Sequence, residues 1–209
     1  MDLLDVKLIE KKNVYKGYFE VVLYRLQHRL FSRNWSKEIT REVFERGHAA
    51  SALLYDPETD DLVLIEQFRP GAYAALSSPW HKTSEMTPWL IEIVAGIIEE
   101  GETPEDVIRR ECIEEAGCEV TDIIPICKYL VSPGGSTETM FSFCGRVNSK
   151  DAEGIHGVIS EGEDIRVMVR NSNEVIAMLD RGEIKNSMTI IPLQWFQHNK
   201  KMVREKWLR

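Results

Sequence analysis

The pattern of apolar and polar positions predicts a strand-rich amino-terminal part of the chain. Residues 18–26 and 39–44 are rich in aromatic and β-branched side chains, which favours strands. The polar run Lys11–Asn13 ahead of them predicts a turn. We therefore expect a small β-rich subdomain over residues 1–45 and a second domain over residues 46–209.

The second domain opens with a predicted hairpin. Apolar residues 49–55 and 62–68 flank a segment, Asp56–Asp61, whose Asp, Pro and Thr residues are typical of turns. Residues Gly71–Thr87 follow as an expected long loop, a feature that is often functional. The later elements expected from the pattern are strands at 89–94, 123–131, 140–147 and 165–169 and helices at 104–116, 174–179 and 192–200. This mixture indicates an α/β or α+β protein.

Composition and charge argue against several kinds of partner and site. The chain has 209 residues and a formal net charge of −8, which argues against a nucleic-acid backbone as partner. Its four cysteines form no C-x-x-C pair, so we expect neither a zinc site nor disulfides. No apolar run is long enough to span a membrane and no signal peptide is evident, which predicts a cytoplasmic protein. The basic tail, which ends near Trp207, is expected to be a terminal helix with one anchored Trp, with a partner-binding helix as the alternative.

The helix predicted at 104–116 has signals at both ends. Thr103 is a good N-cap, Pro104 suits the first helical position, and Gly117 suits the left-handed position that ends a helix. Apolar residues recur every four positions and predict a buried stripe: Ile108, Cys112 and Ala116.

Three carboxylates lie together on another side of this helix. Glu111, Glu114 and Glu115 are spaced at i, i+3 and i+4, where like charges repel. Arg110 can pair with Glu114, which leaves Glu111 facing Glu115. A solvated acidic face is the ordinary interpretation of such a pattern. A hard divalent cation such as Mg²⁺ is the alternative, because it prefers carboxylate oxygens and accepts phosphates as further ligands.

The residues around the helix favour the second interpretation. They follow a fixed spacing: Gly, five residues, Glu, seven residues, Arg-Glu, two residues, Glu-Glu, one residue, Gly. Seven specified positions match by chance on the order of once in 10⁷ start points. The frame resembles the box of the Nudix hydrolases, with Cys112 and Cys118 where the family usually has bulky aliphatic residues. The matching positions are Gly96, Glu102, Arg110, Glu111, Glu114, Glu115 and Gly117.

This resemblance, which covers residues 47–195, implies a fold and a metal site. Nudix proteins are α/β/α sandwiches around a mixed sheet. The likeness makes Glu111, Glu115 and the carbonyl of Ala95 metal ligands, with Glu114 nearby. Arg110 would orient these carboxylates, and Glu102 would be structural. We expect two or more Mg²⁺ ions per site, with Mn²⁺ as the alternative.

The acidic segment Ser160–Arg166 resembles the loop that supplies the general base in bacterial ADP-ribose pyrophosphatases. On that match, Glu161 accepts the proton of the attacking water and Glu163 is a further metal ligand. A solvated loop remains the alternative.

A second segment resembles the same branch of the family. Ser132, Pro133, Gly134 and Glu138 lie after the box where that branch carries a proline, and they would contact the sugar or phosphate of the substrate. A simple turn is the alternative interpretation. The likeness also makes Arg69 and Ile97 substrate-binding residues, and the planar guanidinium of Arg69 suits two phosphate oxygens.

In the amino-terminal part, Tyr18, Phe19 and Arg41 resemble the residues that reach the nucleotide, although ordinary strand core explains the two aromatic residues equally well. In this branch the amino-terminal strands exchange contacts between two subunits, so the resemblance implies a homodimer with shared active sites. The Gly71–Thr87 loop departs from the branch because it is long.

The resemblance therefore predicts metal-dependent hydrolysis of a small-molecule nucleoside diphosphate derivative. ADP-ribose is the expected substrate, attacked at the adenosyl phosphate to give AMP and ribose 5-phosphate. One alternative is another nucleotide sugar, such as GDP-mannose, or a dinucleoside polyphosphate, since the box is common to all these enzymes. The other is a sensor that binds ADP-ribose without cleaving it, which the intact set of box carboxylates disfavours.

Overall fold

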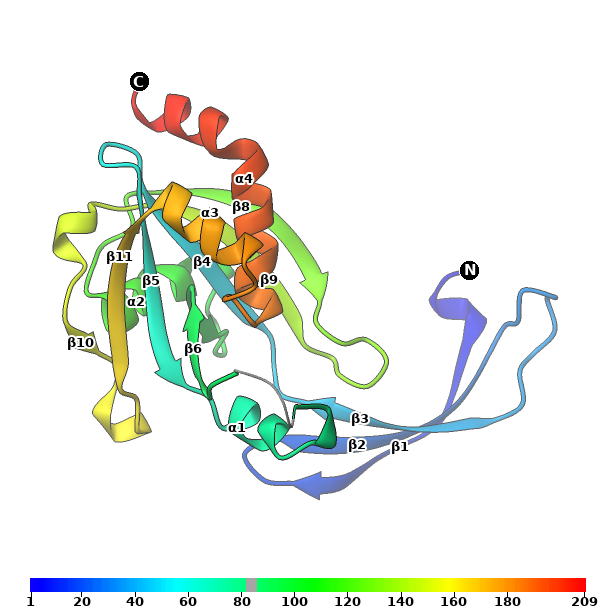
Figure 1. The fold of residues 1–209 in the computed structure, drawn as a ribbon. Helices are drawn as coiled ribbons and strands as arrows, with labels where there is room; N and C mark the ends of the chain where they lie inside the picture. Colours follow the sequence, from blue (N-terminus) through cyan, green and yellow to red (C-terminus); the bar gives the residue numbers. More distant parts are fainter. Residues whose placement is uncertain (82–85) are drawn as a thin grey trace. The chain divides into compact units, whose positions relative to one another are not determined.

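The computed structural model describes residues 1–81 and 86–209, which divide into two compact units (Figure 1). Unit 1 comprises Met1–His48 and Tyr129–Met140, and unit 2 comprises Ala49–Lys128 and Phe141–Arg209. Among the described residues, no helix is long and apolar enough to cross a membrane.

Unit 1 contains a three-stranded antiparallel sheet in the order β1-β2-β3. The sequence-based turn at Lys11–Asn13 is wrong, because these residues lie inside the first strand. That strand is exposed at nearly every position, so its polar side chains resemble those of a turn. The elements of this unit are a short 3₁₀ turn at Leu3–Asp5 and strands β1 (Val6–Lys16), β2 (Glu20–His28) and β3 (Ile39–Glu45).

The remaining strands form a mixed eight-stranded sheet within the described residues. Six of them follow the order β10-β11-β5-β4-β9-β8, while β6 pairs with β5 and β7 pairs with β4. The expected hairpin and later strands are therefore confirmed. The bounds are β4 (Ala49–Asp56), β5 (Asp61–Phe68), β6 (Trp89–Glu92), β7 (Val94–Ile97), β8 (Asp122–Leu130), β9 (Thr139–Arg146), β10 (Ile155–His156) and β11 (Ile165–Asn171).

The segment β6–β7 occupies a special place between β4 and β5. The two strands of the hairpin pair with each other only near their turn, from Leu54 opposite Val63 to Asp56 opposite Asp61. Beyond that point β7 pairs with the first half of β4, and β6 pairs with the second half of β5. The inserted segment thus places Glu92 beside β5 and Gly96 beside β4.

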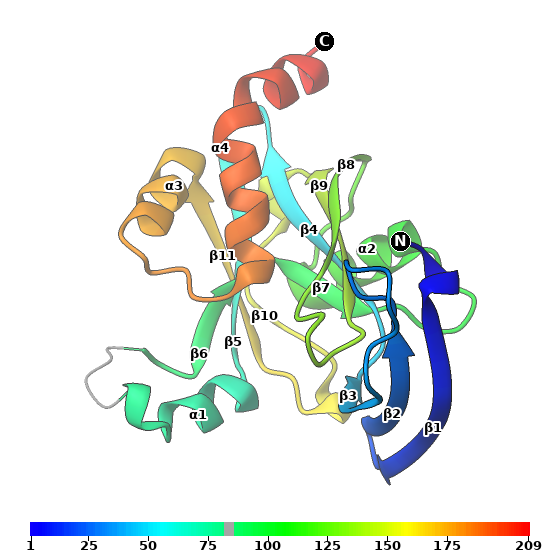
Figure 2. The ribbon, with the colours of Figure 1, turned by 90° about the vertical axis from the view of Figure 1, so that its right-hand side faces the viewer.

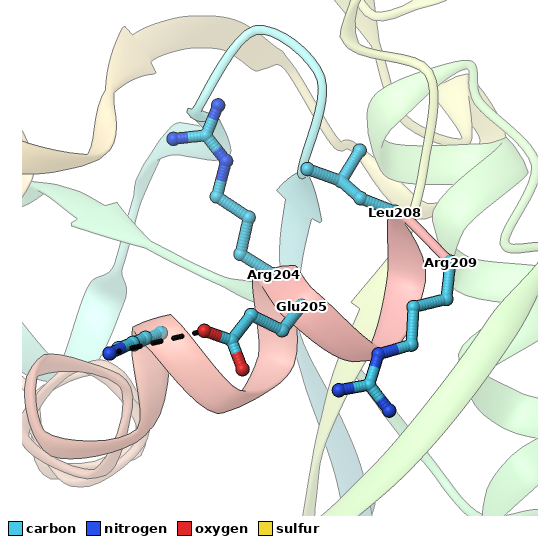
Figure 3. A pocket seen from close by; sticks show the side chains of 5 residues that line it. Arg204, Glu205, Leu208 and Arg209 are labelled. Carbon is cyan, nitrogen blue, oxygen red and sulfur yellow. Dashed lines mark ion pairs between the residues drawn. The ribbon is translucent and has the colours of Figure 1, made fainter.

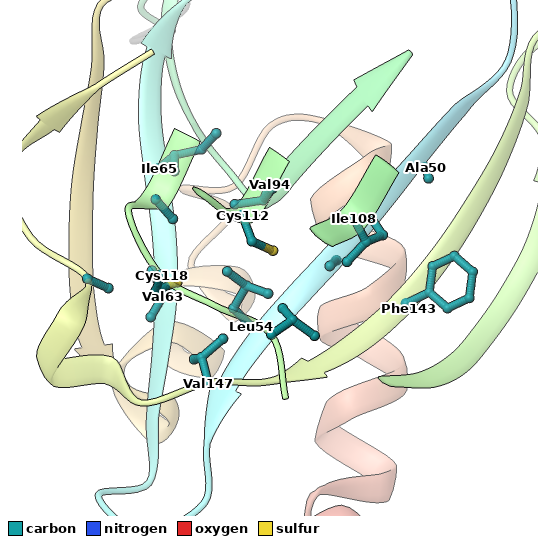
Figure 4. Close-up of a cluster of buried hydrophobic side chains, with 14 of the residues drawn as sticks. Ala50, Leu54, Val63, Ile65, Val94, Ile108, Cys112, Cys118, Phe143 and Val147 are labelled. Atoms are coloured by element: carbon teal, nitrogen blue, oxygen red, sulfur yellow. The ribbon is translucent and has the colours of Figure 1, made fainter. Parts of the chain in front are cut away.

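Alternate residues of the central strands build two cores. Leu54, Val63 and Ile65 pack with Ile108 and Cys112 of α2 (Pro104–Ala116), as Figure 4 shows. The opposite side chains, including those of Leu53 and Leu64, pack with α3 (Ser172–Asp180) and α4 (Ser187–Trp207). Helices therefore cover both faces of the sheet (Figure 2), and the α/β/α sandwich is confirmed.

The last helix is longer than the sequence predicts. It begins at Ser187, after an Asn186 cap, and so includes Pro192, which suits the first turn of a helix and therefore suggested a later start. At its far end Trp207 is buried and its indole Nε1 donates to Asp122 at 2.7 Å. The predicted terminal helix with an anchored Trp is confirmed.

The expected long loop at Gly71–Thr87 is only partly a loop. It contains α1 (Pro70–Leu76), with a proline at its first position, and a 3₁₀ turn at Pro79–His81. The helix has no buried residue and is only two turns long, which explains why periodicity did not reveal it. Residues 82–85 of the expected loop lie outside the described residues.

Candidate active site

The candidate site is built on α2, whose ends are set by the predicted residues. Thr103 and Asp106 form a reciprocal capping box, with the Asp106 amide donating to Thr103 Oγ1 at 3.2 Å. Gly117 ends the helix at φ +66°, and a Cβ there would lie 2.4 Å from Cε1 of His156. Both ends of the helix are therefore defined by caps, and its last turn packs closely against His156.

Arg110 binds several of the box carboxylates at once. Its guanidinium donates to Glu102 at 2.9 Å, to Glu111 at 2.6 Å and to Glu114 at 3.1 Å. The predicted pair with Glu114 is confirmed, and the same guanidinium also binds Glu111, for which the spacing alone had predicted only that it faces Glu115. Because one cation holds three carboxylates, it opposes their mutual repulsion and limits their rotation.

Glu111 explains why the box begins with a glycine. A Cβ at Gly96 would lie 1.7 Å from Oε1 of Glu111 and 2.2 Å from its carboxyl carbon. No side chain can occupy that volume, so the backbone of β7 and the Glu111 carboxylate approach each other directly. Residue 96 is therefore a glycine because the Glu111 carboxylate needs the space, and not because the backbone there has a positive φ.

Glu115 is the most deeply buried of the box carboxylates, with 2% of its surface exposed. Its Oε2 accepts a hydrogen bond of 2.9 Å from the amide of Ala95, and Gln67 Nε2 lies 3.5 Å from its Oε1. Both partners are neutral, so nothing bonded to Glu115 cancels its charge. A buried carboxylate of this kind is costly without a cation.

The pKa values of the two facing carboxylates reflect this environment. The pKa of Glu115 is raised to about 8, chiefly by burial and then by the negative charges of Glu111 and Glu163, against the opposing effects of the Ala95 amide and Arg69. Burial also raises the pKa of Glu111 to about 7, although Arg110 opposes the shift. The region thus carries more negative charge than its own cations neutralise.

Arg69 is held by a buried carboxylate in the inserted segment. Its Nε and Nη2 lie 2.9 Å and 2.7 Å from Oε2 of Glu92, of which 3% is exposed. Burial lowers the pKa of Arg69, but the charge and hydrogen bond of Glu92, together with the charges of Glu115 and Glu163, outweigh that effect and the net shift is upward. Arg69 is therefore a permanent cation beside the box carboxylates.

The two glutamates of the Ser160–Arg166 segment, Glu161 and Glu163, differ in their hydrogen bonds and exposure. Glu163 accepts a hydrogen bond of 2.9 Å from the Val158 amide, and its charge contributes to the raised pKa of both Glu111 and Glu115. Glu161 ends a short 3₁₀ turn, Ile159–Glu161, and its exposed side chain hydrogen-bonds to none of the described residues. Gly157 ties this segment to α2 by donating to the Glu114 carbonyl at 3.0 Å.

The donors present fit a hard divalent cation. Among the described residues, no three His, Cys, Asp or Glu side chains lie close enough together to hold an ion as they stand. Glu111 and Glu115 nevertheless provide carboxylate oxygens, of which those of Glu115 have no cation bonded to them, and the charge of Glu163 acts on both carboxyls. The chemistry of this set suits Mg²⁺ or Mn²⁺ and not the softer metals, which prefer nitrogen or sulfur.

The remaining predicted substrate residues, apart from Ile97, lie in unit 1. Tyr18 and Phe19 precede β2 and form an edge-to-face pair at 4.8 Å, with Tyr18 86% exposed. Arg41 lies in β3 and is exposed. Ile97, at the end of β7 in unit 2, accepts a hydrogen bond of 3.4 Å from Arg110 through its carbonyl.

The Ser132–Glu138 segment forms a turn in unit 1, closed by hydrogen bonds from the Gly135 and Ser136 amides to the Ser132 carbonyl. The turn is joined to β3, because the Phe44 amide donates to the Gly135 carbonyl at 2.8 Å. Glu138 is nearly buried and pairs with Arg46 at 3.4 Å. The conformation is consequently that of a turn, held by the amino-terminal strands.

Two polar residues of the site were missed at the level of sequence, Glu92 and Gln67. Both are buried and both touch Arg69 or Glu115. The signal for Glu92 was present, because a carboxylate between Ile91 and Ile93 in a strand-like run is rarely buried without a partner. For Gln67 the sequence offered no such signal.

A recess of about 420 Å³ at the end of α4 has different chemistry (Figure 3). It is lined by Lys201, Arg204, Glu205, Leu208 and Arg209. Glu205 is its one carboxylate and already lies 4.0 Å from Lys201. This recess therefore lacks the donors of a metal site.

Comparison with known proteins gives a consistent result. A model of the NUDIX domain matches residues 45–198. The ADP-ribose pyrophosphatase of Escherichia coli (strain K12) is 46% identical over 203 residues, covering 97% of this chain and 93% of that protein. The ADP-ribose pyrophosphatase of Haemophilus influenzae is 37% identical over 205 residues, covering 98% and 92%.

Two further matches are more distant. The GDP-mannose pyrophosphatase of Citrobacter koseri is 33% identical over 191 residues, covering 91% of this chain and 94% of that protein. A crystal structure of an ADP compounds hydrolase superposes with a TM-score of 0.70 at 16% identity, covering 98% of this chain and 99% of that one. At that identity the superposition establishes the fold alone.

Proposed function

The chain belongs to the NUDIX domain family, and on that premise we propose that it hydrolyses the pyrophosphate of ADP-ribose to AMP and ribose 5-phosphate. The observation that carries the proposal is the facing pair Glu111 and Glu115 on α2: Glu115 is buried with only neutral hydrogen-bond partners, and both carboxyls have raised pKa values. Identity of 46% to an ADP-ribose pyrophosphatase across nearly the whole chain supports the choice of substrate.

We propose that Glu111, Glu115, Glu163 and the Ala95 carbonyl hold two or more Mg²⁺ ions, with Mn²⁺ as the alternative. When bound, the cations neutralise the pyrophosphate oxygens and polarise the phosphorus. Arg110 keeps the carboxylates oriented through the contacts described above.

Arg69, in this proposal, binds the pyrophosphate through the part of its guanidinium that Glu92 does not occupy. Glu161 accepts a proton from the water that attacks the adenosyl phosphorus. The bond from that phosphorus to the bridging oxygen breaks, and ribose 5-phosphate leaves. The exposed position of Glu161, outside any hydrogen bond to the described residues, is compatible with this role.

For the rest of the substrate we propose contacts from Ile97 and from unit 1. Tyr18, Phe19 and Arg41 would bind the nucleoside, and Ser132, Pro133, Gly134 and Glu138 would bind the sugar or phosphate. The exposed aromatic ring of Tyr18 is compatible with stacking on adenine.

We also propose a homodimer formed by the amino-terminal residues 1–45. The first strand of unit 1 exposes apolar side chains, with Leu8 59%, Val14 46% and Tyr15 61% exposed, and such surface is often covered by a partner. Light scattering should give a mass of twice 24.1 kDa. A monomer at the same concentration would refute the dimer.

A cytoplasmic location is the remaining proposal, supported by four cysteines that are all free thiols. Its test is fractionation of the source cells, in which the protein should appear with cytoplasmic markers.

The substrate is tested by a panel of nucleoside diphosphate derivatives. Purified protein is incubated with ADP-ribose, GDP-mannose or diadenosine polyphosphates, with Mg²⁺ or with chelator, and the released nucleotides are quantified. We expect metal-dependent hydrolysis of ADP-ribose with a kcat/KM at least ~10-fold above the others, a margin that a few substrate-specific contacts provide. GDP-mannose as the preferred substrate would overturn the assignment, and the GDP-mannose pyrophosphatase relative makes it the second candidate.

A further inference from the structure

The conformation of Arg69 depends on Glu92, a buried carboxylate that has no place in the chemistry proposed above. Glu92 lies in β6 opposite Ile65 of β5. Side chains of cross-strand partners point to the same face, and so do residues two apart in one strand. Ile65, Gln67 and Glu92 therefore face the core beneath α2, to which Ile65 belongs, and Arg69, the first residue after β5, reaches Glu92 from the end of the strand.

Arg69 uses one edge of its guanidinium for this contact. Both Nε and Nη2 lie within 2.9 Å of the same oxygen, Oε2 of Glu92. A guanidinium has five donors in one plane, so the Nη1 side stays available for oxygen atoms of a ligand. The side chain of Arg69 is 39% exposed while that of Glu92 is 4% exposed, which is the arrangement expected of an arginine anchored at its back.

Gln67 links this pair to the box. Its Nε2 lies 3.4 Å from Oε2 of Glu92 and 3.5 Å from Oε1 of Glu115. Glu92, which binds Arg69, and Glu115 therefore flank the same amide, and Arg69 is close enough to Glu115 for its charge to act on the pKa of that carboxyl. Glu92 competes with Glu115 for Arg69. Because Arg69 binds Glu92, it stays on the Glu92 side of Gln67.

We propose that Glu92 is a positioning residue with two effects on this site. It presents the Nη1 side of Arg69 to the pyrophosphate, and it prevents Arg69 from pairing with Glu115, a carboxylate that the cation needs. The inference rests on the proposed function, in which Arg69 binds pyrophosphate and Glu115 binds metal.

The test is a double-mutant cycle with Glu92→Gln, Arg69→Ala and the double variant. Glu92→Gln should lower kcat/KM by roughly 10- to 100-fold, as is usual for residues that orient binding groups. If Glu92 acts through Arg69, the double variant is no less active than Arg69→Ala alone. A further loss of 10-fold or more in the double variant would overturn the proposal, and so would an unchanged Glu92→Gln enzyme.

Metal binding gives an independent readout. Titration calorimetry with Mn²⁺ in the absence of substrate should show weaker binding in Glu92→Gln, because Arg69 is then able to pair with Glu115. Removing Arg69 as well should restore the affinity. A general disruption of the fold would instead weaken binding in both variants and contradict the proposal.

The matched control is Glu183→Gln, which removes a carboxylate from another ion pair. Glu183 is exposed, lies after α3 and pairs with Arg181 at 2.6 Å. Its activity and Mn²⁺ affinity should equal those of the wild type. If Glu92→Gln does not fold, the cycle is repeated with Glu92→Asp, which retains the charge but shortens the side chain, and the same non-additivity is required.

The cycle is run with whichever nucleoside diphosphate derivative the wild-type protein hydrolyses, and with ADP-ribose binding if it hydrolyses none. The wild-type assay therefore tests the proposed substrate, and the double-mutant cycle tests the role of Glu92. A failure of one proposal can be distinguished from a failure of the other.

Discussion

Glu115 is the residue at which burial and charge oppose each other most strongly. Its carboxylate is 2% exposed, accepts hydrogen bonds only from neutral groups, and has Glu111 and Glu163 as negative neighbours. In the metal-free protein the proton is therefore retained to a higher pH than in the unfolded chain. This difference makes stability depend on pH.

The sign of that dependence follows from the two pKa values. The native pKa of Glu115 is about 8, and the unfolded value of a glutamate is about 4.3. Between them the native state binds more protons than the unfolded state, so the free energy of unfolding falls as pH rises through this window. We predict that thermal denaturation of the metal-free protein shows a lower Tm at pH 8 than at pH 5.5.

Two comparisons check that Glu115 causes the trend. Mg²⁺ should raise the Tm more at pH 8 than at pH 5.5, because only the ionised carboxylate binds the cation. Glu115→Gln should flatten the metal-free profile, whereas Glu105→Gln, in the exposed first turn of the same helix, should not. An equal slope in Glu115→Gln would contradict this account.

At the scale of elements, the close approach of β7 to α2 depends on Gly96. We predict that Gly96→Ala displaces the Glu111 carboxylate, since the added Cβ would coincide with it. The expected result is a loss of roughly 100-fold in kcat/KM together with weaker stabilisation by Mg²⁺, because the proposed metal ligand Glu111 is misplaced. Gly71→Ala is the matched control, as a Cβ there meets nothing within 4 Å. Wild-type activity in Gly96→Ala would contradict the geometry.

Asp60 holds the β4–β5 turn to the two helices beneath it. Its carboxylate accepts hydrogen bonds from Tyr55 at 2.8 Å, Ser172 at 2.9 Å and Lys200 at 2.7 Å, and its backbone is left-handed, at φ +64°. We predict that Asp60→Asn lowers the free energy of unfolding by about 2 kcal/mol through the lost charge. Asp60→Ala should cost a further ~1 kcal/mol, because alanine tolerates that backbone poorly.

Urea denaturation of both variants in metal-free buffer measures these costs. The pKa of Asp60 is lowered because the hydrogen bonds from Lys200, Tyr55 and Ser172 outweigh burial, so the wild-type advantage should shrink as pH falls below the usual carboxylate range. Equal stability of the Asn and Ala variants would exclude the backbone contribution.

The elements with local signals were the ones that the sequence could predict. Both ends of α2 were found because Thr103 and Gly117 act within a few residues of themselves. The first strand was missed because its exposure pattern contains no alternation, and Lys11–Asn13 therefore resembled a turn. The start of α4 was missed because Pro192, a residue that favours the first turn, lies inside the helix.

At the scale of the whole molecule, the site depends on contacts that no local pattern encodes. The sequence motif predicted that Glu111 and Glu115 lie together, because residues four apart share one face of a helix. Gln67 contacts Glu115, and Glu92 joins this group through Gln67 and Arg69 because β6–β7 inserts where β4 and β5 separate. Likewise the association of the Ser132–Glu138 turn with the amino-terminal strands depends on hydrogen bonds to Phe44, far away in the sequence.

The central claim is that cation-binding carboxylates on α2 support hydrolysis of ADP-ribose. The most direct measurement is phosphorus NMR of ADP-ribose incubated with Mg²⁺ and either the wild-type protein or Glu115→Gln. We predict that the wild type converts the pyrophosphate signal into equal signals of AMP and ribose 5-phosphate. The folded variant should be about a thousand-fold slower, since metal stabilisation of the transition state amounts to several kcal/mol. Equal rates in the two proteins, or conversion that persists in chelator, would contradict the account.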